Sequence, residues 1–148
     1  MKRFSIRRAT KKDAPIIGKL IGGWLKWEIP RRESIVRAIE ARELLVADWQ
    51  NEVVGFIHCV MFEDIIDGGQ NAFITAFYVS PKFRNRKIGS NLLQEAIKNA
   101  LNEGVVGISA STANPSARRL YEKHNFKQFM GEWTMGEVFL EMDMNHPV

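Results

Sequence analysis

Apolar residues near the start of the chain first alternate with polar ones and then recur every three or four positions. The alternation over residues 4–8 predicts a first strand, and the spacing over residues 15–21 predicts a helix with one apolar face. Gly22 and Gly23 disfavour helix continuation, so we expect the helix to stop there. Residues 22–30 should then form a loop or a broken helix.

The middle of the chain carries apolar runs separated by turn residues. Residues 44–47 and 53–62 are rich in strand formers, and Gln50-Asn51 between them predicts a hairpin. A second turn at 67–70 leads into another strand-forming run over 72–79, which ends before a proline.

The clearest helical pattern covers residues 88–101, where apolar side chains repeat at spacings of three and four, and Gly104 follows as the residue that ends the helix. Thr10 with Asp13, and Asn114 with Pro115, are typical of helix N-termini. The second pair predicts a short helix to about residue 124. The remaining predicted elements are a helix over 31–42 and strands over 105–110, 127–130 and 138–142.

This order of elements predicts a mixed sheet with helices available for both of its faces, an α/β (or α+β) fold. The chain has 148 residues, of which 45% are hydrophobic and 26% charged, a composition typical of one globular domain. It contains no internal repeat, low-complexity tract or linker-like stretch, so we expect a single domain over 1–148.

Few residues in the chain suit a metal or a disulfide. Cys59 is the only cysteine, and the three histidines, His58, His124 and His146, lie far apart in the sequence. We therefore expect no metal and no internal disulfide. The N-terminus lacks a signal-peptide pattern and no apolar run approaches the about 20 residues that span a bilayer, so we expect a cytoplasmic protein without a membrane partner.

Positive charge is concentrated in one short segment. The formal net charge is +4, and Lys82, Arg84, Arg86 and Lys87 account for it, because the remaining chain balances at 17 basic and 17 acidic residues. No acidic residue occurs between Asp67 and Glu95. A cluster this compact suits a small polyanion better than the extended surface that a nucleic acid requires, so nucleic-acid binding is the weaker alternative.

The same segment connects a predicted strand to the best-defined predicted helix. The first N–H groups of a helix have no partner inside it and lie at the positive end of its dipole, so they bind phosphate well. Gly89 and Ser90 are small enough to let a pyrophosphate approach the main chain, and Arg84, Arg86 and Lys87 add charge. The alternative is an ordinary solvated basic turn.

The segment from Tyr78 to Leu93 resembles the acetyl-coenzyme A motif of the GNAT superfamily of N-acetyltransferases. That motif reads Arg or Gln, two residues, Gly or Ala, one residue, Gly or Ala. Arg84 and Gly89 match its first and last positions, whereas Lys87 replaces the middle glycine. The stretch from Asn114 to Phe126 also looks like the family, and the order of elements fits over nearly the whole chain.

The resemblance implies a GNAT-type, largely antiparallel sheet with splayed central parallel strands, and acetyl-CoA as the cofactor, released as coenzyme A. Main-chain groups of Phe77, Tyr78 and Val79 would pair with the pantetheine arm, and an N–H there would stabilise the oxyanion. The implied cofactor-binding residues, including those of the basic segment, are Phe77, Tyr78, Val79, Arg84, Asn85, Arg86, Lys87, Ile88, Gly89, Ser90, Asn114, Ala117 and Tyr121.

In the family, a tyrosine at the position of Tyr121 is often the general acid that protonates the departing thiolate. Its helical spacing with Ala117 also fits a core aromatic residue, and both interpretations stay open. The strand over 73–77 has no carboxylate, so it supplies no general base. The other candidates for that role are Glu28, Glu63, Asp64, Glu132 and His58.

The acceptor is a primary amine whose identity stays open: a small amine, a lysine side chain or a protein N-terminus. In the family, residues 22–30 and 131–136 usually border the acceptor, which makes Trp24, Trp27, Glu28 and Trp133 candidate substrate residues. They could equally be core residues. A non-catalytic sensor of coenzyme A esters is the alternative function, and a homodimer stays open.

Overall fold

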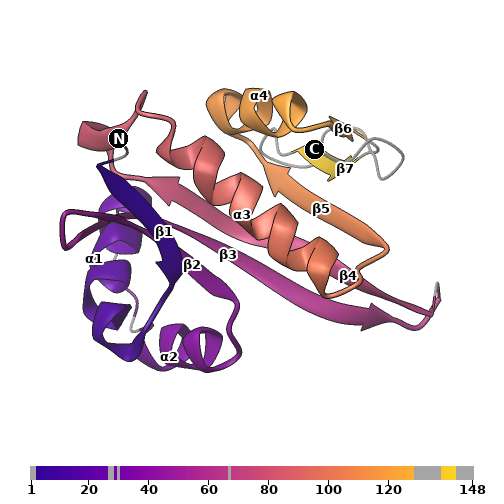
Figure 1. Ribbon diagram of the computed structural model, residues 1–148, viewed down its shortest axis with the longest axis horizontal. Coiled ribbons are helices and arrows are strands. Elements are labelled where there is room, and N and C mark those ends of the chain that lie inside the picture. The colour runs from indigo at the N-terminus through magenta and orange to yellow at the C-terminus, as the bar shows by residue number, and fades with distance from the viewer. Residues whose placement is uncertain (1–2, 27–28, 30, 67, 129–137, 143–148) are drawn as a thin grey trace. The chain divides into compact units, whose positions relative to one another are not determined.

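A computed structural model describes residues 3–26, 29, 31–66, 68–128 and 138–142 (Figure 1). Seven strands form a sheet in the order β1-β2-β3-β4-β5-β7-β6 among these residues. Their bounds are β1 Phe4–Arg8, β2 Leu44–Trp49, β3 Glu52–Asp64, β4 Gly69–Val79, β5 Gly107–Thr112, β6 Phe126–Gln128 and β7 Val138–Met142. The helices are α1 Ala14–Leu25, α2 Arg32–Glu40, α3 Ile88–Asn102 and α4 Pro115–Lys123, with short 3₁₀ helices η1 Lys11–Asp13 and η2 Pro81–Phe83.

The predicted fold class is confirmed. Strands β4 and β5 run parallel, whereas β1–β2, β2–β3, β5–β7 and β6–β7 are antiparallel, so the sheet is mixed and mostly antiparallel. The chain forms two compact units, Met1–His58 with Ala76–Leu93, and Cys59–Thr75 with Gln94–Val148. The single domain over 1–148 stays a prediction. None of the described helices is long and apolar enough to cross a membrane.

The first unit is built on β1, β2 and the start of β3, against which α1 and α2 lie (Figure 1). The predicted hairpin is confirmed: Gln50 and Asn51 connect β2 to β3 with φ of 50° and 72°, as a turn of the primed type requires. Apolar side chains of both helices and of β2 and β3 form its core, among them Ile17, Ile35, Ile39, Val46 and Phe56.

The expected end of the first helix at Gly22 and Gly23 is wrong. Helix α1 continues through both glycines to Leu25, and the Gly22 carbonyl accepts the N–H of Lys26, which takes a left-handed φ of 64°. Each glycine costs about 1 kcal/mol relative to alanine within a helix. Packing outweighs this cost, because Trp24 in the last turn stacks on Tyr78 of β4.

The second unit contains the parallel pair, in which Asn71 is opposite Gly107 and Ile74 opposite Ala110. Strand β5 ends at Thr112, two residues beyond the predicted strand, and β6 covers Phe126–Gln128 rather than 127–130, of which 129–130 lie outside the described residues. Helices α3 and α4 begin and end close to their predicted bounds.

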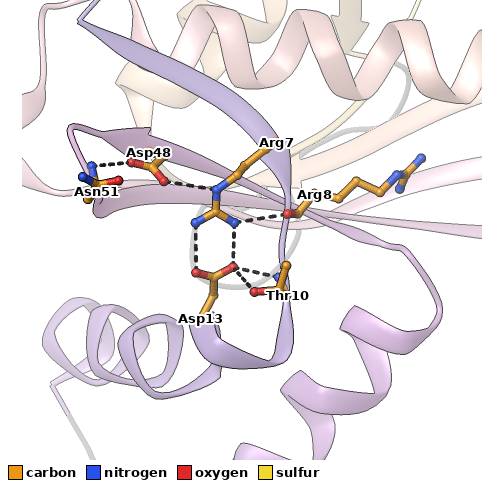
Figure 2. Close-up of polar contacts among 6 residues, drawn as sticks. All are labelled: Arg7, Arg8, Thr10, Asp13, Asp48 and Asn51. Carbon is orange, nitrogen blue, oxygen red and sulfur yellow. Dashed lines mark hydrogen bonds and ion pairs between the residues drawn. The ribbon is translucent and has the colours of Figure 1, made fainter.

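A network of charged side chains connects β1, η1 and β2 in the first unit (Figure 2). The Arg7 guanidinium donates two hydrogen bonds to Asp13, Nη1 to Oδ2 at 2.8 Å and Nη2 to Oδ1 at 3.1 Å. Its Nε donates to Asp48 Oδ2 at 3.1 Å. The Thr10 N–H donates to Asp13 Oδ2 at 2.7 Å, as the predicted capping pair requires. One arginine therefore holds two carboxylates from different elements.

Asp13 is buried, with 6% of its surface exposed. Burial by itself would raise the pKa of its carboxyl, but the hydrogen bonds from Arg7 and Thr10 favour the ionised form and lower the pKa overall. Its folded pKa is therefore below the unfolded value of about 3.9. The stabilisation is complete above about pH 4 and is lost as the pH falls through the folded pKa.

We predict that Asp13→Asn lowers the free energy of unfolding at pH 7 by about 1–3 kcal/mol, because Arg7 loses one of its two charged partners. The variant should also lose less stability than the native protein between pH 5 and pH 3, since it no longer has this carboxylate to protonate. Urea unfolding at both pH values measures this. The control is Glu40→Gln, which removes an exposed ion pair with Lys11 and should change stability by less than about 0.5 kcal/mol. Equal acid sensitivity in Asp13→Asn and the native protein would contradict the assignment.

Candidate functional site

The basic segment begins where β4 leaves the sheet. The Ser80 N–H donates to the Val54 carbonyl at 2.8 Å, and the Phe83 N–H donates to the Ser80 carbonyl at 2.9 Å, which closes η2. Gly55 is needed beside this strand end, because a Cβ there would lie 2.9 Å from the Tyr78 carbonyl oxygen. The close approach of β3 to β4 therefore fixes where the segment starts.

Residues 84–87, which we call the phosphate loop, have an unusual backbone. Asn85 and Lys87 take left-handed conformations, with φ of 63° and 66°, which non-glycine residues rarely adopt. Such alternation can turn successive N–H groups toward a common point and create a concave anion site. The Asn91 N–H donates to the Lys87 carbonyl at 3.0 Å, so the N–H groups of residues 88–90 lie in the first turn of α3.

The departure of Lys87 from the family motif has a simple explanation in this geometry. Lys87 is at a position where the motif has Gly or Ala, and of these two glycine adopts the positive φ found here without steric cost. Lys87 adopts the same conformation, so its side chain does not shift the loop out of the left-handed region. The residue is exposed, so its side chain does not lie in the core.

Arg84 is held by the end of β4. Its Nε donates to the Val79 carbonyl at 3.0 Å, and its guanidinium carbon lies 5.5 Å from the centre of the Tyr78 ring. Trp24 of α1 stacks on the same tyrosine, with ring centres 5.1 Å apart and planes 17° apart. The structure thus brings a candidate substrate residue and two candidate cofactor residues together.

Arg86 lies on a second aromatic cluster, which sequence reasoning missed. Its guanidinium carbon is 5.0 Å from the Trp49 ring and 5.6 Å from the Phe83 ring. Trp49 also contacts Phe83, at 5.4 Å, and stacks on Phe4 at 6.3 Å. No local pattern signals this cluster, since its members come from β1, β2 and η2 and meet only in the folded chain.

In the second unit, Asn114, Ala117 and Tyr121 lie at and within α4. Asn114 is a confirmed N-cap, and its Oδ1 accepts the N–H groups of Ser116 at 2.8 Å and Ala117 at 3.3 Å. The cap fixes the start of α4, and Tyr121 is the residue of this helix that is buried in the second unit.

Tyr121 is buried, with 2% of its surface exposed, and its ring lies 5.2 Å from that of Phe126. Burial, with a smaller effect of nearby Cys59, raises the pKa of its hydroxyl well above the usual value of about 10. The phenol is therefore protonated at neutral pH.

The remaining candidates are only partly described. His58 pairs with Glu43, Nε2 to Oε1 at 3.0 Å, and Asp64 accepts the Ile66 N–H in the β3–β4 turn at 2.7 Å. Glu63 is exposed at the end of β3. Trp27, Glu28, Glu132 and Trp133 lie outside the described residues. Within the described part of the chain, no group of three or more His, Cys, Asp or Glu side chains could hold a metal ion.

Comparisons with known proteins agree with the resemblance. The model of the acetyltransferase (GNAT) family matches residues 14–126. An uncharacterized N-acetyltransferase from Archaeoglobus fulgidus is 27% identical over 111 residues, which cover 73% of this chain and 70% of that protein. The structure of the PaiA N-acetyltransferase from Thermoplasma acidophilum, in complex with coenzyme A, is similar with a TM-score of 0.77 at 18% identity, covering 96% of this chain and 99% of that one.

A ribosomal-protein-alanine N-acetyltransferase from Brucella melitensis has a similar structure as well. Its TM-score is 0.79 at 21% identity, and the match covers 93% of this chain and 98% of that chain. At these identities the two solved structures establish a common fold.

We predict that Lys87→Gly keeps the fold and raises the free energy of unfolding by up to about 1 kcal/mol. Glycine removes the cost of the left-handed conformation, and the added freedom of the unfolded chain offsets part of that gain. Thermal or urea unfolding measures it. Lys87→Ala is the matched control: it removes the same ammonium but keeps a Cβ, so it should show no gain. A loss of more than about 1 kcal/mol in Lys87→Gly would show that the lysine side chain has a structural role.

Proposed function

This chain belongs to the acetyltransferase (GNAT) family, and we propose that it transfers an acetyl group from acetyl-CoA to a primary amine by direct attack in a ternary complex. The observation that carries the proposal is the phosphate loop. It combines two left-handed residues with two arginines that lie over aromatic rings, it contains no acidic residue, and it leads directly into the N-terminus of α3. Such a segment suits the phosphates of coenzyme A.

The residues of this segment fit the cofactor chemically. We propose that the N–H groups of Ile88, Gly89 and Ser90 bind the pyrophosphate, with added charge from Arg84 and Lys87. Main-chain groups of Phe77–Val79 would pair with the pantetheine arm. Asn114 and Ala117 at the start of α4 are the remaining proposed cofactor contacts.

Bound acetyl-CoA supplies a thioester whose acetyl carbonyl carbon accepts a nucleophile. A C–N bond forms to the amine nitrogen, the C–S bond breaks, the amine loses a proton and the sulfur gains one. We propose that an N–H of Phe77–Val79 stabilises the negative charge on the carbonyl oxygen during this exchange. This role uses the main chain, so it places little demand on side-chain identity there.

Tyr121 is our proposed general acid for the sulfur. Its raised pKa means that the proton is present at every working pH, but also that its transfer to a thiolate is uphill. A free thiol has a pKa of about 8.5 and leaves well near neutral pH without full protonation. We therefore expect a modest contribution, at or below the low end of the about 10²- to 10⁴-fold that is typical of general acid catalysis.

The acceptor is proposed only as a primary amine: a small molecule, a lysine side chain or a protein N-terminus. Trp24 is 38% exposed at the end of α1 and is our candidate for contact with it, together with Trp27, Glu28 and Trp133. Tyr78 already contacts the cationic group of Arg84, so we do not assign its ring to a cationic acceptor. The similar Brucella structure is that of a ribosomal-protein-alanine N-acetyltransferase, which supports keeping a protein among the proposed acceptors.

A coenzyme A ester sensor is the second candidate, and one observation favours it. Residues 73–77 of β4 contain no carboxylate, and His58 in the first unit is engaged with Glu43. An acetyltransferase without a side-chain base needs an amine that arrives neutral, or a water that takes the proton. Turnover separates the two candidates.

We predict that purified protein and acetyl-CoA release free thiol only when a suitable amine is added, in a screen of small amines, lysine peptides and peptides with free N-termini. With the best amine, Tyr121→Phe should lower kcat and kcat/KM together by about 10- to 100-fold while affinity for coenzyme A is kept, because the proton is needed only as the bond breaks.

Phenylalanine keeps the ring beside Phe126, so the fold should survive, and the melting temperature checks this. A native rate in Tyr121→Phe would make Tyr121 a packing residue. Tight acetyl-CoA binding without thiol release for any amine would favour the sensor.

A further inference from the structure

We propose that Trp49 and Phe83 are positioning residues that hold Arg86 and thereby keep the phosphate loop in its binding conformation before the cofactor arrives. The assignment of the cofactor rests on the proposed function, whereas the anchoring of the loop rests on the structure alone. On this view, Arg86 acts through the backbone rather than as a direct phosphate ligand.

The contacts around Arg86 are those of a cation over aromatic rings. The guanidinium carbon is 5.0 Å from the Trp49 ring centre and 5.6 Å from that of Phe83, both within the distance at which a cation is attracted to a ring. The two rings are tilted by 56° to one another, so they present two walls rather than one flat surface. Guanidinium groups suit such sites because they are planar and weakly hydrated.

The loop needs an anchor of this kind because its backbone is strained at two positions. Asn85 and Lys87 are both left-handed and neither is glycine. Residues in that region persist where the surroundings determine the conformation. The two arginines alternate with the two left-handed residues: Arg84 is bound to the Val79 carbonyl and lies over Tyr78, and Arg86 lies over Trp49. Each left-handed residue thus has a held residue before it.

Trp49 is itself fixed by the sheet. It is opposite Phe4 in the register of β1 and β2, and the two rings are stacked with planes 8° apart. The preceding residue, Asp48, accepts hydrogen bonds from Arg7 Nε and from the Asn51 N–H in the hairpin turn. The anchor therefore connects the loop to the network of Arg7, Asp13 and Asp48.

The first experiment needs no cofactor. Trypsin cleaves after Arg or Lys only when the side chain and the flanking backbone are released, so cleavage after Arg86 and Lys87 reports opening of the loop. We expect Trp49→Leu to speed this cleavage by about three- to fivefold. The loss of one cation–π contact raises the fraction of molecules in which the loop is open by about that factor, and the cleavage rate follows this fraction. Trp49→Phe, which keeps a ring, should restore most of the protection. Phe62→Leu, at an aromatic residue in β3 that is 42% exposed, is the control and should leave the rate unchanged.

Cleavage after Lys19 in α1, followed in the same digests, distinguishes global unfolding from opening of the loop. Opening of the loop alone leaves the rate of cleavage after Lys19 unchanged. If Trp49→Leu unfolds, Phe83→Leu replaces it, since Phe83 lies in the short η2 segment outside the main core. Cleavage after Arg86 at the native rate in a folded Phe83→Leu or Trp49→Leu variant would overturn the anchoring.

The second experiment uses coenzyme A and calorimetry. We expect Trp49→Leu to weaken binding by about three- to fivefold, and the double variant Trp49→Leu with Arg86→Met to bind no more weakly than either single variant, because both remove one contact. Two results would overturn the proposal. The first is native or higher affinity for coenzyme A in Trp49→Leu, which is expected if Arg86 binds phosphate directly. The second is a double variant that binds coenzyme A more weakly than both single variants. Failure of the native protein to bind coenzyme A would contradict the proposed function while leaving the trypsin result intact.

Discussion

The function proposed for this chain depends on a backbone that turns twice into the left-handed region before α3 begins. A chain of L-amino acids adopts that conformation at a cost unless glycine is present. Here, Asn85 and Lys87 adopt it without glycine, so the surrounding side chains must supply what glycine would otherwise supply. Arg84 and Arg86 lie over aromatic rings, and we propose that these are the contacts that do so.

The rest of the first unit supports those rings. Gly55 lets β3 approach the Tyr78 carbonyl, and α1 continues past its two glycines so that Trp24 reaches Tyr78. Arg7 also binds Asp13 and Asp48, and Asp48 is the residue that precedes Trp49 in β2. We propose that this ion-pair network and these aromatic contacts position one short loop. In the second unit, α4 begins at the Asn114 cap and contains the buried Tyr121, our proposed general acid.

Local sequence signals predicted the elements that local physics determines. The helix over 88–101, the Gln50-Asn51 turn and the Asn114 cap follow from periodicity, turn chemistry and capping, and each is found where expected. The signals failed at Gly22, where a contact with a distant strand outweighs an intrinsic preference. They also missed the role of Trp49, because nothing in its neighbourhood in the sequence indicates that Arg86 will lie on it. The left-handed φ of Lys87 explains the motif departure, but only once the backbone is known.

The central claim is that the start of α3 receives the phosphates of coenzyme A, and calorimetry on one glycine tests it most directly. Gly89→Val places a branched side chain where the pyrophosphate must approach the main chain. The control is Gly23→Val in α1, where an added Cβ meets nothing within 4 Å. We predict that Gly23→Val binds coenzyme A like the native protein, whereas Gly89→Val, still folded by its melting curve, loses at least about tenfold in affinity. Native affinity in a folded Gly89→Val variant would contradict the account.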